Sequence, residues 1–361
     1  MRERIAIVYN EPISCRYDTA NEEKAVLGVL EAVAAVRRSL FELGHKVTCI
    51  PLMPPIEQAV DNLNLQDVDT VFNLFEGFCG YPETEALLPE YLETIGIPYT
   101  GCSAMALRLS LGKAKVKVLL QAAGIPTPDF QLLNPETLHA FQLGYSCIVK
   151  PPSEDASHGI NEASVVGDLT SLRTQVQLVS GSYGNALVEV FVGGREFNVT
   201  VLGNSQLAVL PVSEIVYSLP SEMPEILTFA AKWEPDSPYF WGTRVVCPAE
   251  IEANEQVLIR EMALAAFRLL GCRGYARVDM RMDKEGQLNV IEVNPNPDIS
   301  PDAGAARQAK AAGMSYTRFI NKIVQLAIEK ETYDCKNTPH VSKRQISPDE
   351  HTTRCARVQA V

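Results

Sequence analysis

The sequence predicts a mixed α/β and α+β protein with more than one lobe. Near the N-terminus three strand-like segments, RIAIVYN, KVTCIPL and DTVFNLF, alternate with a helical segment over residues 21–43, an order typical of a parallel sheet. Further along, short strands and helices are segregated, as in an α+β domain. The 361 residues exceed the roughly 250–300 that one hydrophobic core usually serves. We therefore expect two or three lobes with a small-molecule site between them.

Hydrophobic periodicity divides the chain into four segments. Residues 1–106 hold the alternation of strands and helices. Residues 107–212 open with a helix and continue through four short strands, and residues 213–330 contain a long helix, a strand pair and a final helix. Residues 331–361 are polar and lack periodicity, which predicts a disordered tail.

Composition excludes several classes of protein. A net charge of -12 argues against nucleic acid as a partner, because phosphates require a basic surface. The apolar stretches are too short for a membrane span, and the N-terminal one is too short for a signal peptide. The nine cysteines form no CxxC pair and show no metal-ligand spacing. We expect a cytoplasmic protein with reduced thiols that acts on small molecules.

The strand pair RVDMRM and LNVIEVNP groups polar residues on one face. A turn centred on Lys284 and Glu285 predicts that Arg277 lies opposite Glu292. Because strand side chains alternate, four polar residues share one face: Arg277, Asp279, Glu292 and Asn294. Four apolar residues share the other, core-facing side: Val278, Met280, Ile291 and Val293.

Two interpretations of this polar face are open from spacing alone. Two carboxylates and a carboxamide are hard oxygen ligands, which suit magnesium holding polyphosphate oxygens, and a neighbouring arginine can stabilise negative charge on a reacting carboxyl oxygen. Equally, Arg277 and Glu292 form a surface ion pair while the other two side chains are solvated. Lys150 adds a weaker signal, since it precedes the small polar loop SEDASHG, whose amides and Ser157 suit phosphates.

From residue 1 to 328 the chain resembles the ATP-grasp enzymes and, within them, the D-alanine–D-alanine ligase family. The resemblance rests on seven segments: IGIPYTGC (95–102), LGKAKVKVLLQAAGIPTP (from 111), IVKPPSEDASHGI (from 148), LVEVFVGGREFNVTVLG (from 187), GCRGYARVDM (from 271), VIEVNPNPDIS (from 290) and AARQAKAAGMSY (from 305). It implies a three-lobed ATP-grasp fold with an N-terminal parallel-sheet lobe and ATP held between the central and C-terminal lobes.

The resemblance also assigns roles by position. For ATP it implies Lys113 and Lys150 on phosphates and adenine, Ser157 in the loop over the triphosphate, Glu189 and Val192 in the adenine hinge, Glu196 on the ribose, and Lys232 on a phosphate. For Mg²⁺, or Mn²⁺, it implies Asp279, Glu292 and Asn294. The candidate catalytic residues are Arg277 for the tetrahedral intermediate, Ser157, and Glu11 for the ammonium of the first substrate.

The implied reaction is ATP-dependent ligation of a carboxylate to an amine through an acyl phosphate, nominally the activity of a D-alanine–D-alanine ligase. The alternatives are a ligase for another amino acid or amine and, less favoured, a non-catalytic nucleotide-binding protein. The resemblance further implies a homodimer formed through the first lobe.

The substrate-side motifs depart from the family pattern. Glu76 stands where the family has a histidine, and Asp298 stands where it has a glycine. The loop over residues 299–304 is shorter, and YNEPISC replaces the glutamate motif after the first strand. These departures predict a changed substrate pocket and leave the identity and stereochemistry of both substrates open.

Overall fold

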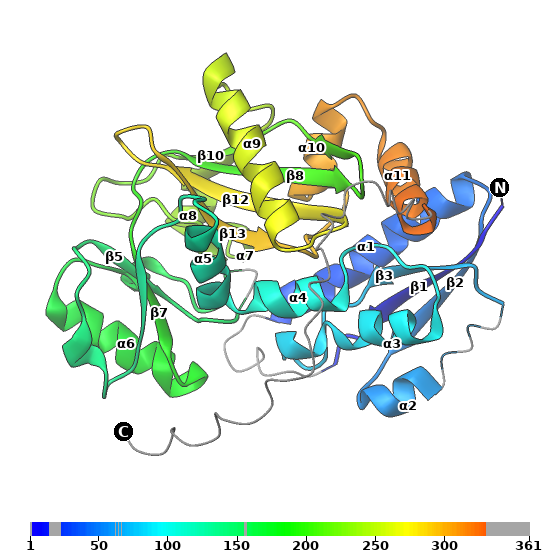
Figure 1. Ribbon diagram of the computed structural model, residues 1–361, viewed down its shortest axis with the longest axis horizontal. Helices are drawn as coiled ribbons and strands as arrows, with labels where there is room; N and C mark the ends of the chain where they lie inside the picture. Colours follow the sequence, from blue (N-terminus) through cyan, green and yellow to red (C-terminus); the bar gives the residue numbers. More distant parts are fainter. Residues whose placement is uncertain are drawn as a thin grey trace, which may run out of the picture. The chain divides into compact units, whose positions relative to one another are not determined.

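The computed structural model describes residues 2–13, 23–61, 63, 65, 67–154 and 157–329 (Figure 1). The expected disordered tail, residues 331–361, lies outside the described residues. Within the described ranges, no helix combines the length and the apolar character that crossing a membrane requires.

The N-terminal part contains a parallel three-stranded sheet in the order β2-β1-β3, as the sequence predicts. Its elements are β1 (Arg4–Asn10), α1 (Glu23–Glu42), β2 (Lys46–Leu52), α2 (Ile56–Asp61), β3 (Thr70–Leu74) and α3 (Leu87–Ile95). Ile5 and Ile7 of β1 belong to the core that α1 lines, whereas Ala6 and Val8 belong to the core that α3 lines. Burial on both faces explains the continuous apolar run of this strand.

The central part is an antiparallel sheet in the order β4-β7-β5-β6, covered by one helix. Its elements are α4 (Ala104–Leu111), α5 (Lys113–Ala122), β4 (Phe130–Leu133), β5 (Cys147–Lys150), β6 (Val165–Val166), α6 (Leu169–Tyr183) and β7 (Ala186–Val190). Short 3-10 turns occupy Pro82–Thr84, Leu138–Ala140 and Glu162–Ser164. Gly112 is non-helical and separates α4 from α5, so Lys113 begins the second helix.

The C-terminal part is built on a six-stranded sheet, with β11-β10-β8-β12-β13 in line and β9 paired to β8. Its elements are β8 (Glu196–Gly203), β9 (Leu207–Val209), β10 (Ser213–Tyr217), α7 (Phe229–Trp233), α8 (Pro238–Gly242), β11 (Thr243–Val246), α9 (Ala253–Leu269), β12 (Gly274–Met282), β13 (Leu288–Asn294), α10 (Gly304–Ala311) and α11 (Tyr316–Ile328). The sequence analysis grouped β8 and β9 with residues 107–212, but they hydrogen-bond in this sheet. We retain three lobes as a proposal, with the second boundary moved between β7 and β8.

The two faces of the C-terminal sheet have different partners (Figure 1). Val199 and Val201 of β8 pack in the core that α9 lines, while Leu202 packs in the core of α1, α10 and α11. Because side chains alternate along a strand, Asn198 and Thr200 of β8 share the second face with Leu202. On that face α10 packs against the C-terminal part of β8. The N-terminal end of β8 on the same face is available to a ligand.

A buried glutamine fixes α10 to this face. The Gln308 side chain, with 0% exposure, accepts a hydrogen bond from the backbone N–H of Thr200 at 2.8 Å. Its Nε2 donates to the carbonyl oxygen of Asn198 and to the Asn198 side chain, both at 2.9 Å, and to Ser213 Oγ at 3.1 Å. One side chain thus satisfies polar groups of two neighbouring strands.

We expect Gln308→Leu to lower the free energy of unfolding by about 3 kcal/mol, because buried donors and acceptors on β8 lose their partner. Chemical denaturation measures this change. Gln177→Leu on the exposed surface of α6 is the matched control and should stay within about 0.5 kcal/mol of wild type. Equal effects of the two substitutions would contradict the anchoring role of Gln308.

Candidate functional site

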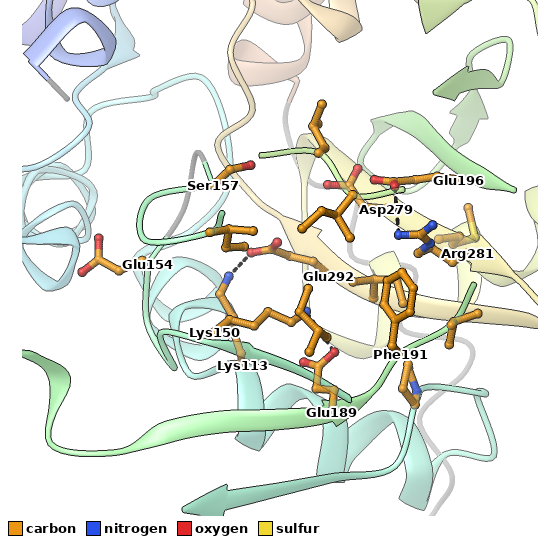
Figure 2. A pocket seen from close by; sticks show the side chains of 18 of the residues that line it. Lys113, Lys150, Glu154, Ser157, Glu189, Phe191, Glu196, Asp279, Arg281 and Glu292 are labelled. Carbon is orange, nitrogen blue, oxygen red and sulfur yellow. Dashed lines mark hydrogen bonds and ion pairs between the residues drawn. The ribbon is translucent and has the colours of Figure 1, made fainter. Parts of the chain in front are cut away.

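A cleft lies between the β4-β7-β5-β6 sheet and the C-terminal sheet (Figure 2). The cleft brings together eleven residues singled out in the sequence: Lys113, Lys150, Ser157, Glu189, Val192, Glu196, Lys232, Arg277, Asp279, Glu292 and Asn294. Glu11 follows β1, where its N–H donates to the carbonyl oxygen of Leu52 at 2.9 Å, and it does not line this cleft.

The register of the β12–β13 hairpin differs from the predicted one. Arg277 lies opposite Asn294, and Asp279 lies opposite Glu292. A bulge after Asp279 leaves Ile291 without a partner, so Ile291 lines the cleft instead of the core. The predicted pairing and the predicted core position of Ile291 are therefore wrong.

The turn explains the shift in register. Asp283 Oδ1 accepts hydrogen bonds from the N–H groups of Glu285 at 3.0 Å and Gln287 at 2.7 Å, which centres the turn on Glu285. The extra residue in the bulge then restores the alternation at Glu292 and Asn294. The four polar residues consequently still share one face, as predicted.

Cations compensate both carboxylates of the hairpin. Arg277 forms a bidentate pair with Asp279, with Nε–Oδ1 and Nη2–Oδ2 distances of 2.7 Å. Lys113, at the start of α5, pairs with Glu292. The structure thus pairs Arg277 with Asp279 and Lys113 with Glu292. Each combines a half-buried carboxylate with a cation that can exchange it for another anion.

On the opposite wall, two lysines share one buried glutamate. Glu189 Oε2 lies 2.9 Å from Lys150 Nζ, and Glu189 Oε1 lies 3.4 Å from Lys117 Nζ. Lys117 is 1% exposed and also donates to Thr127 Oγ1 at 2.9 Å. Burial lowers the pKa of Lys117 to about 8. Burial alone would raise the pKa of Glu189, but the two ammonium groups lower it.

Sequence reasoning missed Lys117. Its spacing of four residues from Lys113 in KAKVK places both on one face of α5 and could have identified it.

A second carboxylate, Glu196, is held by two residues that the sequence analysis also missed. Tyr217 Oη donates to Glu196 Oε2 at 2.6 Å, and Arg281 Nη1 lies 3.3 Å from the same oxygen. Figure 2 shows Glu196 and Arg281 side by side, away from the lysines. Arg281 falls at the next alternate position of β12 after Arg277 and Asp279, which is the signal that could have found it.

Lys232 connects the cleft to the loop after β5. Its Nζ donates to Ser157 Oγ at 3.1 Å. Burial, with the charge of Arg277 adding to it, lowers the pKa of Lys232 to about 8. A lysine with this pKa changes its charge within the physiological range.

We expect Lys117→Met to destabilise the fold by about 3 kcal/mol, because Glu189 then keeps only Lys150 to compensate its buried charge. Thermal and chemical unfolding measure the change, and Glu189→Gln in the same chain should recover part of it. The matched control is Lys115→Met on the exposed side of α5. A Lys117→Met effect no larger than that of the control would contradict the pairing.

Comparisons with known proteins agree with this geometry. The family model described as the D-ala D-ala ligase C-terminus matches residues 119–325. A D-alanine–D-alanine ligase of Alcanivorax borkumensis is 31% identical over 302 residues, 83% of this chain and 89% of that protein. The uncharacterized protein y4sG of Sinorhizobium fredii is 36% identical over 263 residues, 71% of this chain and 74% of that protein.

Solved structures show the same fold. The D-alanine–D-alanine ligase of Bacillus anthracis complexed with ATP aligns with a TM-score of 0.69 and 23% identity, covering 91% of this chain and 97% of that one. The fold is thus the ATP-grasp fold of mixed parallel and antiparallel sheets. With the family model matching more than half of its residues, the chain belongs to the D-alanine–D-alanine ligase family of ATP-grasp ligases.

Proposed function

We propose that this protein is an ATP-dependent carboxylate–amine ligase that forms a peptide bond through an acyl phosphate, nominally a D-alanine–D-alanine ligase. One observation carries the proposal beyond family membership. A single cleft combines cationic side chains with the paired carboxylates of the β12–β13 hairpin. Four of the cations are Lys113, Lys150, Lys232 and Arg277, and the fifth, Arg281, pairs with Glu196. Such a set suits a polyphosphate whose terminal group is transferred.

The roles implied by the family resemblance give ATP one orientation in the cleft. Val192, in the segment between β7 and β8, and Glu189 are assigned to the adenine, and Glu196 to the ribose; all three line the cleft. The nucleotide phosphates then reach the hairpin, where Lys113 and Arg277 exchange their carboxylate partners for phosphate or acyl oxygens. This exchange keeps each cation paired throughout the reaction.

The hairpin also fits magnesium, and manganese equally, as a set of oxygen donors. Asp279 and Glu292 are cross-strand partners, with Asn294 on the same face. Magnesium is commonly bound by one or two carboxylates together with substrate phosphates. In the part of the chain that the structure describes, no three His, Cys, Asp or Glu side chains converge. Nucleotide oxygens and water would supply the remaining ligands of a bound magnesium ion. When bound, the metal neutralises charge on the transferred phosphoryl group.

The reaction needs no nucleophilic side chain. A substrate carboxylate attacks the γ-phosphorus of ATP, giving an acyl phosphate and ADP, and the amine then attacks the acyl carbon and releases phosphate. Arg277 stabilises the oxyanion of the tetrahedral intermediate. Lys232 and Ser157 hold the phosphate side of the cleft, so the protein contributes positioning and charge compensation.

A ligase for another amine is the second candidate, and two acidic residues favour it. Asn296 Nδ2 donates to the carbonyl oxygen of Phe75 at 3.2 Å, so the segments after β3 and β13 are in contact next to Asn294. Glu76 belongs to the first segment and Asp298 to the second. Desolvation of its carboxyl group, with the Asp298 charge adding to it, raises the pKa of Glu76 to about 7. These carboxylates disfavour an acceptor that carries its own carboxylate nearby.

The proposal includes a cytoplasmic location and a homodimeric assembly. The six cysteines among the described residues are free thiols: Cys49, Cys79, Cys102, Cys147, Cys247 and Cys272. Reduced thiols and the use of ATP fit the cytoplasm. A homodimer through the first lobe follows from the family resemblance alone.

We expect Glu292→Gln to reduce ADP formation roughly 10²–10³-fold while ATP still binds, because the substitution removes a charge needed at the transferred phosphoryl group. A panel of single and paired amino acids and amines, followed by mass spectrometry, supplies the substrates. Glu285→Gln in the exposed turn of the same hairpin is the control and should retain activity. Full activity of Glu292→Gln would refute the metal assignment.

A pH dependence of ATP affinity is expected from Lys232. Below about pH 8 the ammonium is charged and attracts phosphate; as the pH rises through about 8 it loses its proton, so affinity falls. Binding measured between pH 7 and 9 tests this. Lys232→Arg keeps its charge over the whole range and should give a flat profile. Identical profiles for the two proteins would place Lys232 away from the phosphates.

A further inference from the structure

Glu196 is clamped through only one of its two carboxylate oxygens. Tyr217 Oη, at 2.6 Å, and Arg281 Nη1, at 3.3 Å, both contact Oε2. Among the described residues Oε1 has no hydrogen-bond partner, and Glu196 lines the cleft. The carboxylate is therefore oriented with one acceptor oxygen available to a ligand.

The clamp is built into the sheet. Glu196 begins β8, between β10 and β12, and its ladder partner on β12 is Arg281. Tyr217 lies two residues beyond the β10 partner of Glu196, which is the diagonal position on the same face. Backbone pairing thus brings both donors to one oxygen without help from a flexible loop.

Arg281 is itself immobilised. It is 7% exposed, its Nη2 donates to the carbonyl oxygens of Gly194 at 3.3 Å and Glu225 at 2.8 Å, and its guanidinium lies 5.1 Å from the Phe191 ring centroid. Phe191 also lines the cleft, and Figure 2 shows its ring beside Arg281. The cation is held by contacts other than Glu196, so its position does not depend on a ligand.

Tyr217 contributes a permanent donor. Burial raises the pKa of its hydroxyl well above the usual value, and the Glu196 charge raises it further. The hydroxyl therefore stays protonated at any physiological pH and donates to Oε2 throughout.

We propose that Tyr217 and Arg281 are positioning residues that hold Glu196 by Oε2, so that Oε1 accepts a hydrogen bond from a ribose hydroxyl and the site discriminates ribonucleotides from deoxyribonucleotides. The inference rests on the proposed function, because it requires ATP in this cleft with its sugar at Glu196. It adds two residues, Tyr217 and Arg281, that contribute to sugar specificity without contacting the transferred phosphate. A carboxylate fixed by two donors loses little rotamer freedom on binding, so a missing hydroxyl is penalised strongly.

Equilibrium binding of ATP, 2′-deoxy-ATP and 3′-deoxy-ATP tests this without knowledge of the amine substrate. The wild type should prefer ATP over at least one deoxy analogue by tenfold or more, and Tyr217→Phe should reduce that preference by about tenfold. Tyr239→Phe is the matched control: its buried hydroxyl donates to the carbonyl oxygen of Pro224 at 3.2 Å, and it does not line the cleft. It should leave the preference unchanged.

A double-mutant cycle separates positioning from general loosening. If Tyr217 acts through Glu196, Tyr217→Phe should have no further effect on the preference once Glu196→Gln is present. Arg281→Lys provides a second variant that retains the charge but loses the fixed donor geometry, and it should also weaken the preference. Thermal unfolding of each variant verifies that the compared proteins are folded.

Three results would overturn the inference. Equal loss of affinity for ATP and both deoxy analogues in Tyr217→Phe would make the residue merely structural. An unchanged ribose preference in Glu196→Gln would show that the ribose does not bind at Glu196. It would not contradict the proposed ATP-dependent ligation. Failure of the wild type to bind any nucleotide would instead refute the proposed function, and the inference with it.

Discussion

Charge compensation inside the cleft is the constraint on which the rest of the site depends. An isolated charge taken out of water costs several kcal/mol, so buried ions in proteins are paired. Here Glu189 is paired with Lys117 and Lys150, and Asp279 with Arg277. A polyphosphate can enter such a cleft if the lysine and arginine side chains exchange their carboxylate partners for phosphate groups. These side chains donate hydrogen bonds to phosphate oxygens as readily as to carboxylate oxygens.

This exchange depends on where β12 lies. Strand β12 pairs with β8 on one side and β13 on the other, so its alternating side chains reach the middle of the ligand-binding face. Its opposite face packs against α9, which prevents the strand from turning over without burying Arg277 in the core. On the ligand-binding face, Gln308 of α10 hydrogen-bonds to β8, the strand next to β12. The order of packing therefore determines which residues form the site.

The alternation of side chains and the parallel sheet could be derived from the sequence, whereas contacts set by tertiary packing could not. The parallel sheet and the shared face of the hairpin follow from apolar periodicity. The exact register does not, because the hydrogen bonds of Asp283 and the bulge at Ile291 are local details that periodicity does not encode. The predicted segment 107–212 includes β8, whose partners β10 and β12 lie further along the chain and are not indicated by local periodicity. Lys117 and Tyr217 were missed because their roles depend on burial and on a partner from another element.

The carboxylates in the two halves of the cleft have different partners. This difference indicates which half determines the specificity for the amine substrate. In the nucleotide half, carboxylates such as Asp279 and Glu196 have cationic partners, so any phosphate-bearing ligand of the right shape is compatible with the charges present. Beyond Asn294 the balance changes: the Glu76 carboxylate has no hydrogen-bond or ion-pair partner among the described residues, and Asp298 receives hydrogen bonds from the Ser300 N–H and hydroxyl without a cation. An unpaired carboxylate is stabilised by a positively charged ligand and destabilised by an anionic one. Under the proposed function, the choice of amine therefore depends on the contacting segments that carry Glu76 and Asp298.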